Sequence, residues 1–147
     1  MLFLAKSGMA KMICPVCNNL MIVLELNKVE IDYCPACEGV WLDSGELELL
    51  LKNPQSKIEL INSLQKAKGI KENLYRCPIC FKKMIKVYCG NDEKVLIDKC
   101  TRNHGLWFDK GELENVVKFG SLDNENKTLS LLKEMFNYNL SLTKPED

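Results

Sequence analysis

The chain has 147 residues, 46% of them hydrophobic and 27% charged, and its twenty basic side chains balance twenty acidic ones. This composition is typical of a globular, soluble protein with one ordinary domain or two very small ones, and it excludes a disordered chain. Nowhere do about 18 apolar residues run together, and the opening MLFLAKSGMAK lacks the features of a signal peptide. We therefore expect a cytoplasmic protein.

The eight cysteines occur mainly in an internal repeat of short turns, which we call knuckles. CPVC (14–17) and CPAC (34–37) are matched by CPIC (77–80) and CTRNH (100–104), and both copies continue into Gly-x-Trp. A C-x2-C turn presents two thiolates to one metal ion, and two such turns complete a tetrahedral zinc site. A disulfide framework or a redox dithiol is the alternative, which the reducing cytosol disfavours.

The first copy has the pattern of a zinc ribbon, in which a hairpin joins two knuckles. Residues 20–26 and 29–33 alternate with a period of two around Asn27-Lys28, which predicts the hairpin. The expected ligands of the first zinc ion are Cys14, Cys17, Cys34 and Cys37. Glu38 follows the complete set, and we expect it to be a solvated carboxylate.

Each copy continues into a predicted short helix. Asp43-x-x-Glu46 and Asp109-x-x-Glu112 have the spacing of a capping box, in which aspartate is the N-cap and glutamate bonds back to its amide. Because capping explains this spacing, we do not expect catalytic carboxylate pairs. The apolar residues expected to be buried by the helices are Leu47, Leu50, Leu51, Leu113, Val116 and Val117.

A tryptophan precedes each of these helices. We expect Trp41 and Trp107 to cover their own small ribbons as hydrophobic lids, since so small a fold needs a large aromatic side chain beside its metal. Stacking on nucleic-acid bases is the alternative.

Two further helices are predicted outside the copies. Residues 55–68, with Ile58, Ile61 and Leu64 at helical spacing, should form a connecting helix that ends at Gly69. A last helix near 127–140 has a broad apolar face, which must pack on the ribbons or on a second chain to form a homodimer.

The second copy departs from the first at its last knuckle. Asn103 aligns with Cys37, and a carboxamide is a poor zinc ligand. His104 follows, and its longer imidazole can reach the same metal from the shifted position. The expected ligands of the second zinc ion are Cys77, Cys80, Cys100 and His104. A metal-free second copy with a surface histidine is the alternative.

Cys89 has no counterpart in the first copy. The second hairpin is predicted near 83–89 and 94–99, and Cys89 alternates with Ile85 and Val87 within it. We expect a small buried side chain there. Replacement of His104 by Cys89 at the metal is the alternative.

With these motifs, the chain resembles a tandem member of the transcription factor IIB-type zinc ribbon family, which occurs in many short prokaryotic proteins. The resemblance rests on CPVC…CPACEGVWLDSGELE and CPIC…CTRNHGLWFDKGELE, within residues 14–51 and 77–118. It implies a structural zinc ion and a rubredoxin-like ribbon in each copy. Related ribbons of general transcription factors dock on RNA polymerase, so the resemblance also implies a protein partner.

The predicted fold is a small, metal-stabilised α+β protein with two tandem zinc ribbons, each followed by a short helix. We expect a first ribbon with its helix (1–53), a helical linker (54–73), a second ribbon with its helix (74–120), and a C-terminal helix and tail (121–147).

The predicted function is that of a non-catalytic adaptor. A catalytic zinc keeps one position open for water, whereas these sites have four protein ligands. We expect a protein partner, with a link to transcription, and neither a membrane nor a small-molecule substrate.

Two alternatives to the adaptor stay open. Residues 57–86 carry eight basic and two acidic side chains, which favours nucleic-acid binding. Against it, seven thiolates and two zinc ions would change the neutral chain to a charge of about minus three. A rubredoxin-like iron electron carrier is the second alternative, because two C-x2-C turns also hold iron.

Overall fold

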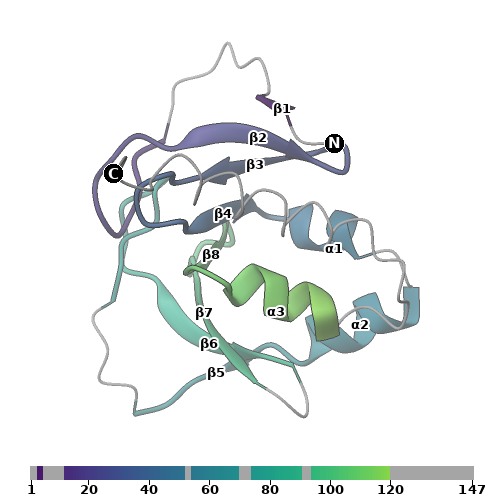
Figure 1. Ribbon diagram of the computed structural model, residues 1–147. Coiled ribbons are helices and arrows are strands. Elements are labelled where there is room, and N and C mark those ends of the chain that lie inside the picture. Colours follow the sequence, from purple (N-terminus) through teal and green to yellow (C-terminus); the bar gives the residue numbers. More distant parts are fainter. Residues whose placement is uncertain (1–2, 5–11, 52–53, 70–73, 91–93, 120–147) are drawn as a thin grey trace, which may run out of the picture.

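The computed structural model describes residues 3–4, 12–51, 54–69, 74–90 and 94–119 (Figure 1). The strands are β1 (Phe3–Leu4), β2 (Ile22–Leu26), β3 (Val29–Tyr33), β4 (Val40–Asp43), β5 (Gln65–Lys66), β6 (Ile85–Cys89), β7 (Val95–Lys99) and β8 (Gly105–Phe108). The helices are α1 (Glu46–Leu50), α2 (Pro54–Asn62) and α3 (Glu112–Phe119). The predicted helix near 127–140 lies outside the described residues.

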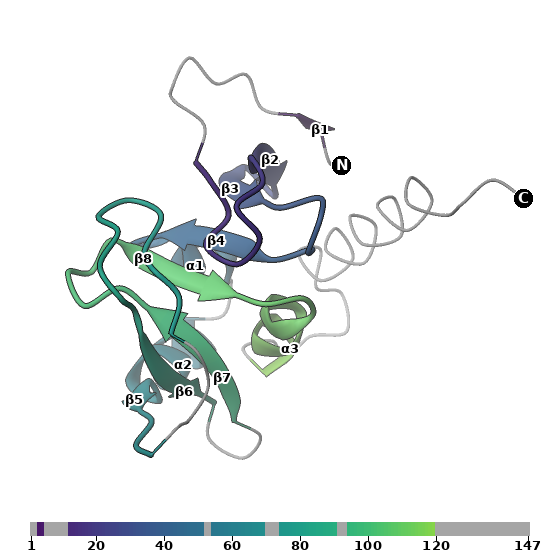
Figure 2. The same cartoon turned by 90° about the vertical axis from the view of Figure 1, so that its left-hand side faces the viewer.

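The described strands form one antiparallel sheet in the order β1-β2-β3-β4-β8-β7-β6-β5. We define residues 12–51 as the first repeat, which supplies β2 to β4, and residues 74–119 as the second repeat, which supplies β6 to β8. Strands β4 and β8 pair in the middle, so the sheet continues from one repeat into the other (Figures 1 and 2). The fold is therefore a small α+β structure with a shared sheet.

The β4–β8 pairing relates the two repeats by an approximate two-fold axis. Trp41 lies opposite Trp107, which is its own counterpart in the other repeat. In an antiparallel pair of two equivalent strands, a two-fold axis passes between the two equivalent residues that lie opposite each other. Here that axis passes between Trp41 and Trp107. The sequence analysis did not predict these two strands.

Each face of the sheet buries a hydrophobic cluster. The first cluster lies beneath the three helices and includes Leu47 of α1, Leu60 of α2 and Val116 of α3. The second cluster, on the other face, joins the two tryptophans to four buried cysteines and two methionines. Because β4 and β8 contribute to both clusters, their sequences VWLD and GLWF each have three consecutive apolar residues and do not alternate.

Both predicted hairpins are present. In the first, Asn27 and Lys28 have φ values of 50° and 70° between β2 and β3. Two consecutive positive φ angles give the turn a twist that matches the strands it joins. The six apolar residues predicted to be buried by the helices of the two repeats are also at most 2% exposed.

The predicted connecting helix is wrong at its C-terminal end. Helix α2 ends at Asn62, and residues 65–66 instead pair with β6 as an edge strand. The hydroxyl of Ser63 donates to the carbonyl of Leu60 at 2.6 Å and accepts from the amide of Gly90 at 2.8 Å, which turns the chain towards β6. Ile58 is 55% exposed, and Leu60 takes the buried position instead.

Candidate metal centres

The four predicted ligands of the first repeat lie together. The Sγ atoms of Cys14 and Cys37 are 3.6 Å apart, and those of Cys17 and Cys34 are 3.4 Å apart. All four sulfur atoms lie within 4.8 Å of one another. A tetrahedral zinc ion with Zn–S bonds of about 2.3 Å places its sulfur ligands about 3.8 Å apart. The cluster therefore has the size and donor set of a zinc site.

The four predicted ligands of the second repeat also lie within 4.8 Å of one another. Nδ1 of His104 is 3.4 Å from Sγ of Cys100 and 4.0 Å from Sγ of Cys77. The Sγ atoms of Cys80 and Cys100 are 3.7 Å apart. Sulfur and nitrogen ligands of one zinc ion lie about 3.6 Å apart, so three cysteines and one histidine fit this metal.

The backbone explains why the histidine comes one position late. In the first three knuckles, Asn18, Glu38 and Phe81 have φ between 61° and 64°, and each amide bonds to the carbonyl four residues back. In the fourth knuckle, Asn103 has φ 59° and bonds to the carbonyl of Cys100, only three residues back. The turn is one residue shorter, so His104 follows it and needs the longer imidazole to reach the other ligands.

Nearby N–H groups point at the sulfur atoms. The amides of Val16, Ile79 and Arg102 lie 3.3–3.4 Å from the first sulfur of three knuckles. The pKa of Cys80 is lowered to about 6, chiefly because its sulfur accepts a hydrogen bond from the Lys82 amide. Burial raises the pKa of Cys77 to about 11. Metal binding at this cluster would therefore release a proton from the buried thiol of Cys77.

Cys89 belongs to neither cluster. Its side chain is fully buried in the hydrophobic cluster beneath the helices, on the face of the sheet opposite the other cysteines. Burial raises the pKa of this thiol to about 12. The prediction of a small buried side chain is confirmed. The eight cysteines all lie in the described part of the chain, and none of them forms a disulfide.

The two tryptophans join the repeats. Both are fully buried, which excludes base stacking. A Cβ atom on Gly39 would collide with the ring of Trp107, and a Cβ atom on Gly105 would collide with the ring of Trp41. The prediction that each tryptophan covers its own ribbon was incomplete, because each ring also packs against the glycine of the other repeat.

The predicted capping boxes form only in part. The amide of Asp43 donates to Glu46, as predicted. The carboxylate of Asp43 instead accepts a hydrogen bond from the indole of Trp41 at 2.9 Å, and Gly45 is the N-cap of α1, so the predicted aspartate N-cap is wrong. The matching distances in the second repeat are 2.9 Å from Asp109 N to Glu112 Oε2 and 3.0 Å from Trp107 Nε1 to Asp109 Oδ1.

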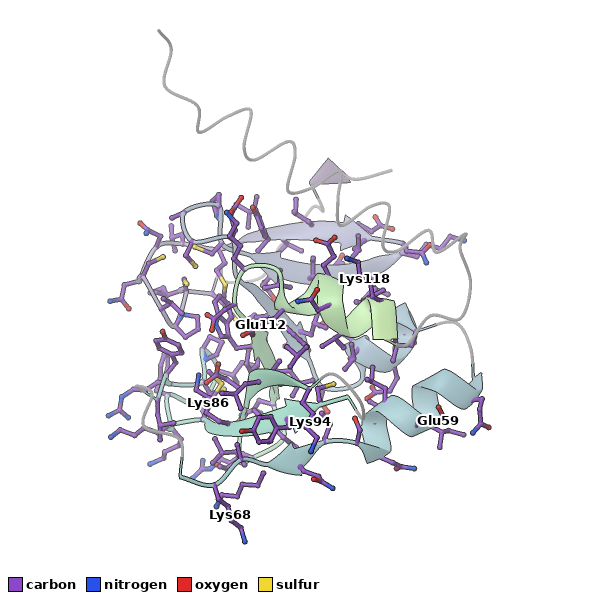
Figure 3. All side chains as sticks on the ribbon, turned by 60° about the horizontal axis from the view of Figure 1, so that its bottom comes forward. Glu59, Lys68, Lys86, Lys94, Glu112 and Lys118 are labelled. Carbon is purple, nitrogen blue, oxygen red and sulfur yellow. The ribbon has the colours of Figure 1, made fainter. Side chains whose placement is uncertain are left out.

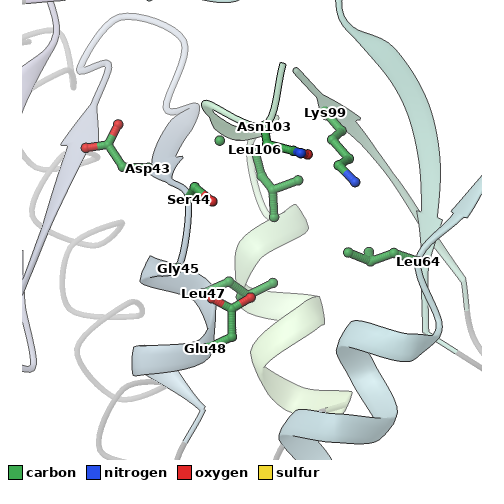
Figure 4. A pocket seen from close by; sticks show the side chains of 10 residues that line it. Asp43, Ser44, Gly45, Leu47, Glu48, Leu64, Lys99, Asn103 and Leu106 are labelled. Carbon is green, nitrogen blue, oxygen red and sulfur yellow. The ribbon is translucent and has the colours of Figure 1, made fainter. Parts of the chain in front are cut away.

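Glu38 is not the solvated carboxylate that we expected. It is 7% exposed and forms an ion pair of 2.6 Å with Lys110 of the other repeat. In the second repeat, the position of Glu38 is occupied by His104, a ligand candidate, because the fourth knuckle is one residue shorter. In the first repeat, the position of Lys110 is occupied by Ser44. A cavity of about 90 Å³ lies beside Ser44 and Asn103, and charged, polar and apolar side chains line it (Figure 4).

Residues 13–53 match the family described as transcription factor zinc-finger. No curated protein and no solved structure matches the chain. Within the described residues, none of the helices has the length and hydropathy needed to cross a membrane. The matched segment contains the first ligand cluster, and the second cluster has the same knuckles, hairpin and helix. The first repeat is therefore similar to the zinc ribbons of the transcription factor zinc-finger family, and the second repeat fits a second ribbon.

Proposed function

We propose that the protein is a non-catalytic adaptor, in which two zinc ions stabilise tandem ribbons that bind another protein. The observation that carries this proposal is that each cluster already contains four protein ligand atoms. A zinc ion held in this way has no open position for water or substrate, so the metal contributes to folding.

Zinc is the metal that the donor sets support best. Three cysteines and one histidine are a common structural zinc set, and the family match of the first repeat also supports zinc. A rubredoxin-like iron carrier remains the alternative for the first cluster, whose four cysteines suit either metal.

Metal analysis of the purified protein tests this assignment. We expect two zinc ions per chain, no iron and no colour. His104→Ala should release one zinc ion while the first site stays loaded, and Cys34→Ser should empty the first site, because three ligands cannot close it. Cys89→Ser is the matched control and should keep both ions. Bound iron, or two zinc ions in His104→Ala, would contradict the assignment.

A partner in the transcription machinery is the finer proposal. The description of the matched family as a transcription factor zinc-finger supports it. We place this function in the cytoplasm, where reduced cysteines remain available to bind metal.

Nucleic-acid binding is the second candidate function. Lys66, Lys68, Arg76, Lys82 and Lys83 are exposed within the basic stretch of residues 57–86. Figure 3 shows Lys68 at the periphery of the molecule, while Lys86 lies among other side chains. Lys86 forms a buried ion pair of 2.9 Å with Asp98 and is therefore not available for phosphate contacts.

A pull-down with the tagged full chain, in zinc-preserving buffer with and without nuclease, separates the two functions. A nuclease-resistant protein at near-stoichiometric yield would support the adaptor. Recovery of nucleic acid alone, released as salt rises, would contradict it and favour the second candidate. The double variant Cys34→Ser/Cys100→Ser, which lacks closed metal sites, is the control for non-specific capture.

A further inference from the structure

A groove of about 330 Å³ lies between the first knuckles of the two repeats. Ile13 and Pro15 line it from the first repeat, and Arg76, Pro78 and Phe81 line it from the second. No carboxylate is among the described residues that line it. The groove is thus apolar with a positive charge at its edge.

Exposed apolar side chains gather at this groove. Seven large hydrophobic side chains are exposed in the described residues, and five of them line the groove or lie next to a lining residue in the chain or in a β-bridge. These are Ile13 (49% exposed), Leu20 (59%), Leu74 (44%), Ile79 (42%) and Phe81 (64%). Contiguous exposed apolar surface is typical of a binding site.

The two walls of the groove differ in charge although they occupy matching positions. In the first repeat, Ile13 forms an isolated antiparallel bridge with Leu20, and in the second repeat Arg76 forms the same bridge with Lys83. Residues directly opposite in such a bridge have their side chains on the same face. On the side of the first repeat, Ile13 therefore lines the groove with Leu20 beside it. On the side of the second repeat, Arg76 lines the groove with Lys83 beside it.

The position of Arg76 is set by a local contact. Its Nη1 donates to the carbonyl of Phe81 at 3.0 Å, which holds the guanidinium across the knuckle beside the groove. The other guanidinium N–H groups remain suited to a carboxylate, which arginine binds with two parallel hydrogen bonds. Lys82 is also exposed next to Phe81 and adds to the positive charge.

We propose that this groove binds a protein segment in which acidic side chains lie next to large apolar ones. The apolar side chains would pack against Ile13, Leu20 and Phe81, and the carboxylates would pair with Arg76 and Lys83. A nucleic-acid strand fits less well, since the wall of Ile13 and Leu20 offers neither cations nor a stacking surface. This inference rests on the proposed adaptor function and specifies the chemistry of its partner.

Selection from a random peptide library on the zinc-loaded full chain tests the inference directly. We expect the enriched peptides to contain Asp or Glu clusters beside Leu, Phe or Trp. A synthetic enriched peptide should bind the full chain in fluorescence polarisation. Enrichment of peptides without this signature would overturn the proposal, and so would the absence of enrichment.

Paired variants locate the binding site. Arg76→Glu/Lys83→Glu and Ile13→Ser/Leu20→Ser should each weaken binding of the synthetic peptide at least about tenfold, which corresponds to about 1.4 kcal/mol. Lys66→Glu/Lys68→Glu is the control, because it makes the same change in charge in β5 and just after it, outside the residues that line the groove. Only variants that retain two zinc ions and the wild-type melting temperature are compared. Equal binding by the groove variants and the wild type would overturn the proposal.

Two further measurements examine other occupants. Competition of the peptide by oligo(dT) would replace the proposed partner with nucleic acid. A dimer in analytical ultracentrifugation that Ile13→Ser/Leu20→Ser dissociates would show that a second copy covers the groove, and would overturn the proposal. If the pull-down captures the same protein with the wild type and with both groove variants, the adaptor function stands and this groove is not its docking site.

Discussion

Gly39 and Gly105 are required by space rather than by backbone conformation. Neither has a positive φ, yet a Cβ atom on either would enter the tryptophan ring of the opposite repeat. The Gly-x-Trp motif therefore has two connected roles, because the tryptophan of one repeat occupies the room that the glycine of the other leaves open. Asp43 fixes the ring of Trp41 further by accepting its indole N–H.

We expect Gly39→Ala to destabilise the fold by about 1–3 kcal/mol, which is typical of overpacking in a buried cluster. Chemical denaturation with zinc in excess measures the change. Because the added methyl group meets Trp107, the smaller ring of Trp107→Phe should recover part of the loss in the double variant.

Trp41→Phe is the matched control for this cycle, since its ring packs against Gly105 and not against Gly39. Its effect should add to that of Gly39→Ala without recovery. Equal coupling of Gly39→Ala to both tryptophan variants would contradict the crossed packing.

At the scale of elements, the short helices α1 and α3 begin with a half-buried glutamate. The carboxylate of Glu46 accepts the amide of Asp43 at the start of α1, and burial raises the pKa of Glu46 from 4.5 to about 8. Between these values the unfolded chain loses this proton while the folded chain keeps it. The free energy of unfolding therefore falls as pH rises through this interval, and the loss stays constant above it.

Glu46→Gln should remove this dependence, because the amide oxygen can still accept the Asp43 hydrogen bond and carries no charge. Relative to wild type, the variant should gain on the order of 1 kcal/mol between pH 6 and pH 8.5, a value reduced for the partial solvent exposure of Glu46. Denaturation of both proteins at each pH, with zinc in excess, measures the difference. Glu48→Gln, in the same helix, is the control. A difference that does not change with pH would contradict the assignment.

The local elements were predictable because their signals lie close together in the chain. The spacing of Cys14 and Cys17, the alternation around Asn27 and the helical spacing of Leu47 each involve only a few neighbouring residues. Strands β4 and β8 lack such a signal, because burial on both faces removes the alternation and the pairing partner is distant in sequence.

The candidate sites were likewise predictable where their signals lie close together in the chain, and not where they depend on distant contacts. Knuckle spacing grouped the eight ligand candidates into the two sets that lie together in the structure, and the shift from Cys37 to His104 suggested the longer side chain. The indole contact of Asp43 was missed, since the capping-box spacing explained that residue by itself. The apolar residue before each buried tryptophan, together with a preceding glycine, is the signal that could have suggested a paired strand.

At the scale of the whole molecule, the two repeats share one sheet and one metal-side cluster. Buried cysteines of both ligand sets lie in the same hydrophobic cluster as Trp41 and Trp107. The repeats also differ in charge: Lys86 pairs with Asp98 in the second, whereas the first has Val23 opposite Asp32. Because the buried cysteines of both ligand sets share one hydrophobic cluster, loss of either zinc ion should weaken the packing of both repeats.

The approximate two-fold axis leads to a prediction for the first repeat alone. In a fragment of residues 1–69, β4 would keep its pairing with β3 but lose its pairing with β8, and Trp41 would lose the glycine on which it packs. Pairing of β4 with β4 of a second fragment would restore both contacts, with Trp41 opposite Trp41 and each ring over Gly39 of the other copy. We therefore expect a homodimer with one zinc ion per chain.

Analytical ultracentrifugation and metal analysis of this fragment measure the two quantities. Gly39→Ala should abolish the dimer, because the added methyl group would lie under the partner ring. Leu49→Ser is the control, since Leu49 is 65% exposed on α1 and lies outside the β4 pairing. A monomeric fragment that keeps its zinc ion and resists denaturation as well as the full chain would show that the first ribbon is complete by itself. The shared sheet would then add little to its stability.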